Sequence, residues 1–316
     1  MTRGPEPFPP APPRATPNEA ELPSEWSLAR TLVGDRKLVA LCGAGMSTRS
    51  GIPDYRGPGT RERARNPVQF AEFSKSAAAR QRYWARATLG WPRFRAVEPN
   101  PAHAALVRLE ATGRLETTIT QNVDRLHHRA GARAVIELHG ALHECVCLDC
   151  GDVSFRDDFH ARVSDANPGF TDAVGRIIEQ APDGDVEIPL ELIDGFVVPG
   201  CEACEGRIKP RVVFFGENVP APTVRAAYDA LEGSELLLVA GSSLTVFSGY
   251  RFVRRARALG IPVIIVGFGP TRGDAEADLK IEAELAEFLP WFADALGSKG
   301  SEASTPNARA DGRAAP

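Results

Sequence analysis

Short runs of apolar residues alternate along the chain with segments in which apolar positions recur every three or four residues. The runs are Lys37–Cys42, Thr117–Thr120, Val135–Leu138, Val212–Phe215, Glu235–Ala240 and Pro262–Val266. Phe247–Leu259, between the last two runs, has the spacing of an amphipathic helix. Apolar runs of this length predict strands that are buried on both faces, and intervening helices predict parallel pairing. The pattern therefore indicates an α/β fold built on a doubly wound, Rossmann-like parallel sheet.

Two regions depart from this alternation of predicted strands and helices. Residues 57–99 are rich in arginine with scattered aromatic side chains, which predicts a mostly helical module. Residues 145–209 hold five of the six cysteines, so we expect a smaller zinc-binding module there. The Rossmann-like part would then comprise 24–56, 100–144 and 210–296. The two ends, 1–23 and 297–316, hold few large apolar side chains and are expected to be disordered.

Composition narrows the class of protein. Apolar residues make up 43% of the chain and charged residues 25%, which is typical of a globular protein. The net charge of -4 gives no electrostatic reason to expect nucleic-acid binding. The chain has no apolar run of the roughly 20 residues that span a bilayer, and no secretory signal pattern. We expect a cytoplasmic monomer that binds no membrane, whose cysteines are metal ligands or free thiols.

A glycine-rich loop follows the first predicted strand. Residues 43–51 read G-A-G-M-S-T-R-S-G, and small residues there allow the backbone to approach a pyrophosphate. The spacing departs from the strict dinucleotide fingerprint, so a simple tight turn is the alternative interpretation. The loop continues into a polar segment, where binding residues are frequent. The candidate cofactor residues here are Gly43, Ala44, Gly45, Ser47, Asp54, Tyr55 and Arg56.

Two later strand ends repeat this feature. Gly241, Ser242 and Ser243 follow one predicted strand, and Gly267, Phe268 and Gly269 follow the next. Each group alone is an ordinary turn. Because the carboxyl ends of parallel strands meet at one edge of a sheet, three such ends together predict a nucleotide site.

A polar segment, T-Q-N-V-D-R-L-H-H at 120–128, ends another predicted strand. Gln121, Asn122 and Asp124 could bond ribose hydroxyls or an amide, but an Asx turn that caps a helix is an equal alternative. His127 and His128 have the pattern of helix-surface residues and are assigned no role.

His139 ends the apolar strand Val135–Leu138 and precedes a glycine, so it should project at the same edge of the sheet. An imidazole with a pKa near ~6.5 suits general-base catalysis at neutral pH. A single histidine is more often structural, and the residue pattern alone leaves both interpretations open.

Four cysteines form two C-x2-C knuckles, Cys147 with Cys150 and Cys201 with Cys204. This pattern predicts one tetrahedral Zn²⁺ with four thiolate ligands and no open coordination position, hence a structural ion. Cys145 lies close enough in the sequence to compete with Cys147, but C-x2-C is the better knuckle.

Taken together, these motifs resemble the sirtuin family over nearly all of 24–296. The segments that carry the resemblance are G-A-G-M-S-T-R-S-G-I-P-D-Y-R-G (43–57), N-P-A-H (100–103), T-Q-N-V-D-R-L-H-H-R-A-G (120–131), E-L-H-G (137–140), V-V-F-F-G-E-N-V-P (212–220), G-S-S-L (241–244) and the cysteine pairs. Further segments resemble class II, the branch of the mitochondrial lipoamidase and ADP-ribosyltransferase type: R-Q-R-Y-W-A-R (80–86), G-W-P-R-F (90–94), A-P-D-G-D-V (181–186), S-G-Y-R-F (248–252) and G-P-T-R (269–272).

The resemblance implies an NAD-dependent deacylase that acts on acyl-lysine in proteins and yields nicotinamide and O-acyl-ADP-ribose. NAD⁺ would lie across the three small-residue loops and near Leu285, with catalytic contacts from Asn122 and Asp124 and with His139 as the base that deprotonates a ribose hydroxyl. The substrate backbone would pair with Val213, Phe214, Phe215, Gly216 and Glu217 by strand addition.

The chain also departs from the family pattern. Gly267 stands where an asparagine usually contacts the adenosine ribose, Arg211 replaces an acidic residue, and Tyr55 replaces a phenylalanine.

Three alternatives to a deacylase remain from the residues. They are a mono-ADP-ribosyltransferase or lipoamidase on the same scaffold, a non-enzymatic zinc-ribbon module, and an ordinary NAD dehydrogenase. The absence of a basic, aromatic-interleaved patch near the knuckles disfavours a nucleic-acid-binding ribbon. Only the glycine loop favours a dehydrogenase.

Overall fold

The computed structural model describes residues 22–54, 68–174 and 193–297. The predicted cofactor residues Tyr55 and Arg56, the class II segment 181–186 and most of both predicted disordered ends lie outside these ranges. Within them, no helix is both long enough and apolar enough to cross a membrane.

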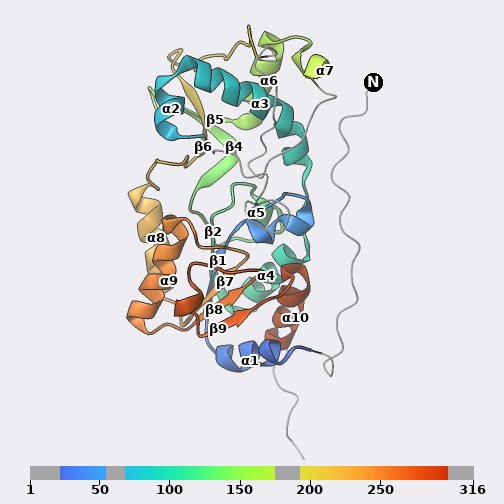
Figure 1. Ribbon diagram of the computed structural model, residues 1–316, viewed down its shortest axis with the longest axis vertical. Helices are drawn as coiled ribbons and strands as arrows, with labels where there is room; N and C mark the ends of the chain where they lie inside the picture. Colours follow the sequence, from blue (N-terminus) through green and yellow to red (C-terminus); the bar gives the residue numbers. More distant parts are fainter. Residues whose placement is uncertain (1–21, 55–67, 175–192, 298–316) are drawn as a thin grey trace, which may run out of the picture.

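A six-stranded parallel sheet forms the larger part of the molecule (Figure 1). Its strands, in the spatial order β3-β2-β1-β7-β8-β9, are β1 (Leu38–Cys42), β2 (Leu115–Thr120), β3 (Val135–Glu137), β7 (Leu236–Ala240), β8 (Val263–Val266) and β9 (Leu279–Ile281). In β1, Leu38, Ala40 and Cys42 face one core, and Val39 and Leu41 face another. Burial on both faces explains why these strands are continuous apolar runs in the sequence.

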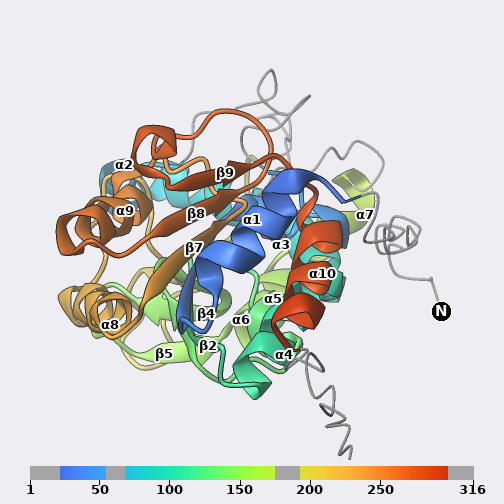
Figure 2. The same ribbon diagram turned by 90° about the horizontal axis from the view of Figure 1, so that it is seen from below.

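Helices cover both faces of this sheet (Figure 2). On one face lie α1 (Ser24–Val33), α4 (Pro101–Ala111) and α10 (Leu285–Gly297), and on the other lie α8 (Ala221–Glu232) and α9 (Phe247–Leu259). The α9 helix has the bounds that the sequence predicted. It ends at Gly260, whose φ of 71° is the left-handed conformation that glycine favours after a helix. The predicted doubly wound α/β fold is therefore confirmed.

A smaller part contains a three-stranded antiparallel sheet, in the order β5-β4-β6 (Figure 1). Its elements are β4 (Gly140–Cys147), β5 (Val153–Phe155), β6 (Ile208–Val212), α2 (Phe70–Lys75), α3 (Ala77–Ala96), α6 (Arg156–Ala166) and α7 (Phe170–Val174). Phe73, Trp84 and Phe159 are fully buried in its core. The short α5 (Leu126–Arg129) follows β2.

One predicted strand is wrong. The sequence placed Val212–Phe215 in the parallel sheet, but β6 ends at Val212 and pairs with β4 in the antiparallel sheet. Beyond Val212 the chain turns, because the Glu217 N–H donates to the Phe214 carbonyl and Gly216 has a φ of 80°. Phe214 is buried against aromatic rings of the smaller part, so an apolar run here does not indicate a continuing strand.

Candidate active site

The loops after β1 and β7 lie side by side at the centre of the larger sheet. β1 pairs with β2 on one side and with β7 on the other, so the strand order reverses between β1 and β7. Ligands of open α/β sheets bind beyond the carboxyl ends of strands at such a point. The predicted residues Gly43–Ser47 and Gly241–Ser243 therefore flank the expected ligand position.

Glycines are required in these loops because their backbones touch. A Cβ on Gly43 would lie 2.7 Å from the Ser242 Cβ, and a Cβ on Gly45 would lie 2.8 Å from the Gly241 Cα. The Gly45 N–H also donates to the Gly241 carbonyl at 2.9 Å. The close packing of one loop on the other, rather than a bound phosphate, is the first reason for the glycines.

On the two adjacent loops, the backbone N–H groups of Ala44, Ser242 and Ser243 have no acceptor among the described residues. Unpaired N–H groups on neighbouring loops are the donors that a pyrophosphate accepts from. The residues present therefore fit the phosphate portion of NAD⁺.

The third predicted loop, after β8, begins at Gly267. Its φ is 143°, a conformation that side-chain-bearing residues rarely adopt, and its N–H donates to the Ile281 carbonyl at 3.0 Å. This backbone explains why a glycine stands here. Gly269 also has a positive φ of 75°. Leu285, the first residue of α10, is 3% exposed and belongs to the core between α10 and the sheet.

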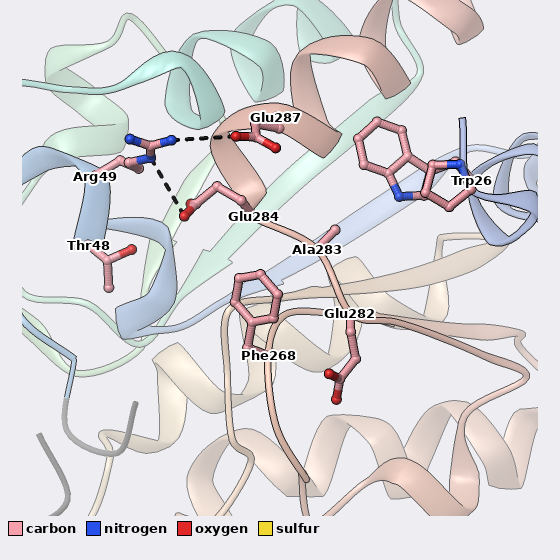
Figure 3. A pocket seen from close by; sticks show the side chains of 9 residues that line it. Trp26, Thr48, Arg49, Phe268, Glu282, Ala283, Glu284 and Glu287 are labelled. Carbon is pink, nitrogen blue, oxygen red and sulfur yellow. Dashed lines mark ion pairs between the residues drawn. The ribbon is translucent and has the colours of Figure 1, made fainter. Parts of the chain in front are cut away.

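A cavity of about 630 Å³ lies between the first and third loops (Figure 3). Its lining residues are Pro23, Trp26, Thr48, Arg49, Phe268, Glu282, Ala283, Glu284 and Glu287. The Arg49 guanidinium forms ion pairs with Glu284 at 3.6 Å and Glu287 at 3.5 Å. The Phe268 ring is 62% exposed, so it offers an apolar face at the cavity.

Polar side chains after β2 connect the loops. The Gln121 amide donates to Ser242 Oγ at 2.8 Å, and the Asn122 amide donates to the Gly43 carbonyl at 3.0 Å and to Ser47 Oγ at 3.2 Å. The predicted cofactor residues 121 and 122 thus brace the two glycine loops in this structure. Asp54 is half-buried at the end of the first described range.

Asp124 forms the Asx turn that was one of the two interpretations left open by the sequence. One carboxyl oxygen accepts from Ser47 Oγ at 2.6 Å, and the other accepts from the Leu126 N–H at 2.9 Å, which forms an Asx turn before α5. The side chain is 6% exposed, and this burial raises its pKa. Arg125, the next residue, has the unusual φ of 59° and is held by Glu144 at 2.8 Å.

His139 lies in the turn between β3 and β4, between the two sheets. Its Nδ1 is 2.9 Å from the Gln121 carbonyl oxygen, and its Nε2 is 2.8 Å from Ser248 Oγ at the start of α9. Burial lowers the pKa of His139, the Gln121 carbonyl opposes this, and the positive charge of Arg251 on α9 adds to the lowering. The imidazole is therefore neutral near pH 7, as a general base must be.

The predicted substrate segment, 213–217, begins beside His139. The Val213 N–H donates to the His139 carbonyl at 2.8 Å, and the Phe70 N–H donates to the Phe215 carbonyl at 2.9 Å. Phe214 is 9% exposed and Phe215 is 42% exposed. β6 is an edge strand, but its Ile208 and Val212 carbonyls already accept hydrogen bonds from Trp84 Nε1 and Lys209 Nζ. A peptide strand next to the base would therefore pair with the segment that follows β6.

Glu217 points inward within this segment. Its carboxylate accepts from the Phe214 N–H and from Lys209 Nζ, both at 2.9 Å. Lys209 is 3% exposed, and burial lowers its pKa. This buried ion pair holds the turn at Gly216; the sequence reasoning missed Lys209, because nothing in the I-K-P-R pattern distinguishes it from a surface lysine.

The four predicted zinc ligands lie together. The sulfur atoms of Cys147, Cys150, Cys201 and Cys204 are all within 4.8 Å of one another. Cys147 to Cys204 is 3.6 Å and Cys150 to Cys201 is 3.8 Å. A tetrahedral Zn²⁺ with Zn–S distances of about 2.3 Å separates its sulfurs by about 3.8 Å. The cluster therefore suits one structural Zn²⁺.

Cys145 is not part of this cluster. It pairs with Pro210 and Ser154 inside the antiparallel sheet, and it is fully buried. Burial raises the pKa of its thiol to about 11. In Cys147, by contrast, burial raises the pKa of the thiol, but hydrogen bonds from the backbone N–H groups of Cys150 and Asp149 and from the neighbouring cysteine side chains outweigh it. They bring the pKa to about 7, which favours the thiolate that a metal binds.

Comparisons with known proteins agree with this geometry. The sequence model of the Sir2 family matches residues 43–248. The chain is 48% identical over 271 residues to the NAD-dependent protein deacylase Sirt4 of Drosophila melanogaster, covering 85% of this chain and 86% of that protein. It is 44% identical over 266 residues to the mitochondrial NAD-dependent protein lipoamidase sirtuin-4 of Bos taurus, with 83% and 84% covered. A solved Sir2–p53 peptide–NAD⁺ structure superimposes with a TM-score of 0.63 and 30% identity, over 84% of this chain and 95% of that one.

Proposed function

The chain belongs to the Sir2 family, and on this premise we propose that it is an NAD-dependent protein-lysine deacylase. One observation carries the proposal. The neutral imidazole of His139 lies between the small-residue loops of the larger sheet and the predicted peptide segment 213–217, whose Val213 N–H donates to the His139 carbonyl. A base in this position can reach both a nucleotide on the loops and a peptide on that segment.

Residues on the three loops would hold NAD⁺. The free N–H groups of Ala44, Ser242 and Ser243 suit its phosphates, and Phe268 offers an apolar face to its base. Gln121, Asn122 and Asp124 lie behind these loops and keep them in register with β2. When bound, NAD⁺ supplies an ADP-ribose acceptor for the acyl group and nicotinamide as the leaving group.

His139 accepts a proton at Nε2. Its Nδ1 faces a carbonyl oxygen, which can only accept a hydrogen bond, so the Nδ1 proton is fixed and the lone pair is on Nε2. A hydroxyl group that approaches Nε2 becomes a stronger nucleophile as it loses its proton. The Gln121 carbonyl then stabilises the positive imidazolium that forms.

The substrate peptide would pair with the segment 213–217, which continues the chain from β6. The backbone of 213–215 lies beside the base, so acyl-lysine in an extended peptide would be presented to the larger sheet. The names of the relatives support a protein substrate, and the bovine one supports lipoyl-lysine as an acyl group to test. Location in the cytoplasm and the monomeric state stay predictions.

The test is an assay of the zinc-loaded full chain against peptides with acetyl-, long-chain acyl- and lipoyl-lysine, with and without NAD⁺. We expect turnover only with NAD⁺ and release of nicotinamide in equal amount. His139→Ala should lower kcat by roughly 10² to 10⁴. His128→Ala, on an exposed neighbour, is the control. Turnover without NAD⁺, or undiminished turnover by His139→Ala, would show that the assignment is wrong.

A further inference from the structure

Ser248 holds the nitrogen that acts as the base. Its Oγ lies 2.8 Å from His139 Nε2, and within the described part of the chain its hydroxyl makes no other hydrogen bond. The two residues are 109 positions apart in the sequence, so the fold alone brings them together. Ser248 is 9% exposed, which keeps water from competing freely for this bond.

The direction of the bond follows from the other side of the ring. The Gln121 carbonyl can only accept a hydrogen bond, so the ring proton is on Nδ1. Nε2 of the neutral ring then has only a lone pair, and the Ser248 hydroxyl must donate to it. After Nε2 gains a proton, the same oxygen can accept from it. A hydroxyl group is the simplest side-chain group that can serve both forms of the imidazole.

The position of Ser248 is fixed by close packing. It is the second residue of α9, where serine usually bonds the backbone, but α9 has no side-chain cap and the hydroxyl points to His139. At the next residue, a Cβ on Gly249 would lie 2.4 Å from Gln121 Oε1. The first turn of α9 therefore packs against the residue whose carbonyl holds the other ring nitrogen.

We propose that Ser248 is a positioning residue for His139: its hydroxyl, together with the Gln121 carbonyl, fixes the tautomer and the plane of the ring, and it yields the Nε2 lone pair to the substrate hydroxyl. Its effect on rate rests on the proposed function. Its effect on the ring does not, because the hydrogen bonds exist without substrate. Arg251, one turn later on α9, is the charged side chain that acts on the ring from this helix.

Kinetics test the effect on rate. In the zinc-loaded full chain, Ser248→Ala should lower kcat about tenfold, because a misplaced base loses rate steeply, while KM for NAD⁺ changes less than twofold. Ser248→Thr keeps a hydroxyl and should recover most of the loss. The control is Ser234→Ala, which removes an equally short, buried hydroxyl bond of 2.8 Å far from the site. An unchanged or raised kcat in Ser248→Ala overturns the proposal.

Histidine NMR tests the ring directly. The chain has six histidines, and His139→Gln identifies the signals of the base. Without substrate, the ¹⁵N shifts should show a proton on Nδ1 only, and Ser248→Ala should shift the Nε2 signal and broaden both signals, whereas Ser234→Ala should not. A wild-type ring with mixed tautomers, or identical spectra in Ser248→Ala, overturns the proposal. If the spectra are as expected but the chain shows no NAD-dependent turnover, the proposed deacylase activity is wrong and the positioning of the His139 ring by Ser248 is still supported.

Discussion

His127 is 2% exposed, although its sequence pattern suggested the surface of a helix. Its ring contacts the ring of His103 at 4.9 Å, and neither of its nitrogens has a partner among the described residues. Burial lowers its pKa to about 4. The sequence could not show this, since α5 is one turn long and its partner lies on α4.

This burial has a consequence for stability at acid pH. Below its unfolded pKa of about 6.5, His127 takes up a proton in the unfolded chain but not in the folded one, so stability falls as the pH falls toward 4. Between pH 7.5 and pH 5 we expect wild type to lose about 2 kcal/mol more unfolding free energy than His127→Gln. Urea unfolding at the two pH values measures the difference. His128→Gln, on an exposed ring, should behave as wild type; equal losses in all three proteins would contradict the prediction.

At single positions, sequence reasoning succeeded where chemistry alone restricts the residue. Four thiolates at knuckle spacing suit little but zinc, and the structure brings their sulfurs together. It failed where a role depends on a distant contact. Ser248 was noted only within a family-like segment, because its importance lies in a bond to His139, far away in the chain.

Among the elements, those buried on both faces were the most predictable. β1 and α9 match their predicted bounds to within a residue, because burial dictates an apolar residue at nearly every inward position. β4 was missed because His143 and Glu144 interrupt its apolar pattern. β9 was missed because three residues are too few to show any period.

The turn after β6 is an element whose shape depends on one buried ion pair. Glu217→Gln would leave the Lys209 ammonium without its carboxylate partner. We expect a loss of roughly 1–3 kcal/mol in unfolding free energy, reduced from a fully buried pair because Glu217 is 24% exposed. KM for the acyl peptide should rise several-fold, since the turn carries the peptide edge, with little change in KM for NAD⁺.

The matched control is Glu232→Gln, which breaks an exposed pair with Arg255 at 2.8 Å. Such surface pairs contribute at most about 1 kcal/mol, and this one is remote from the peptide edge. Denaturant titration and steady-state kinetics compare the two variants. Equal stability and equal KM in both would mean that the buried pair does not hold the turn.

For the whole molecule, the zinc cluster ties together the ends of two strands. Cys147 is the last residue of β4, and Cys201 precedes β6, its antiparallel partner. The other end of β4 follows His139. Loss of the metal should therefore loosen the sheet that supports the base, even though no ligand touches the reaction.

We predict about one Zn²⁺ per chain, lost in Cys147→Ser. Without it, Tm should fall by about 10 °C or more, and acyl-peptide turnover should disappear, because metal binding contributes directly to folding. Elemental analysis, thermal melting and activity measure the three effects. Cys145→Ala should keep its zinc, because Cys145 is outside the cluster. A Cys147→Ser protein that is metal-free, fully folded and active would contradict the structural role of zinc.

The chain passes from the larger sheet to the smaller one at His139, and it returns beyond Val213, whose N–H is bonded to the His139 carbonyl. These two crossings are thus pinned to each other at the base, whereas the chain crosses separately between α3 and α4. If the larger and smaller parts tilt relative to one another about this bonded pair, residues near it are displaced least and loops far from it are displaced most. The proton acceptor would therefore keep its register with both parts during such a movement.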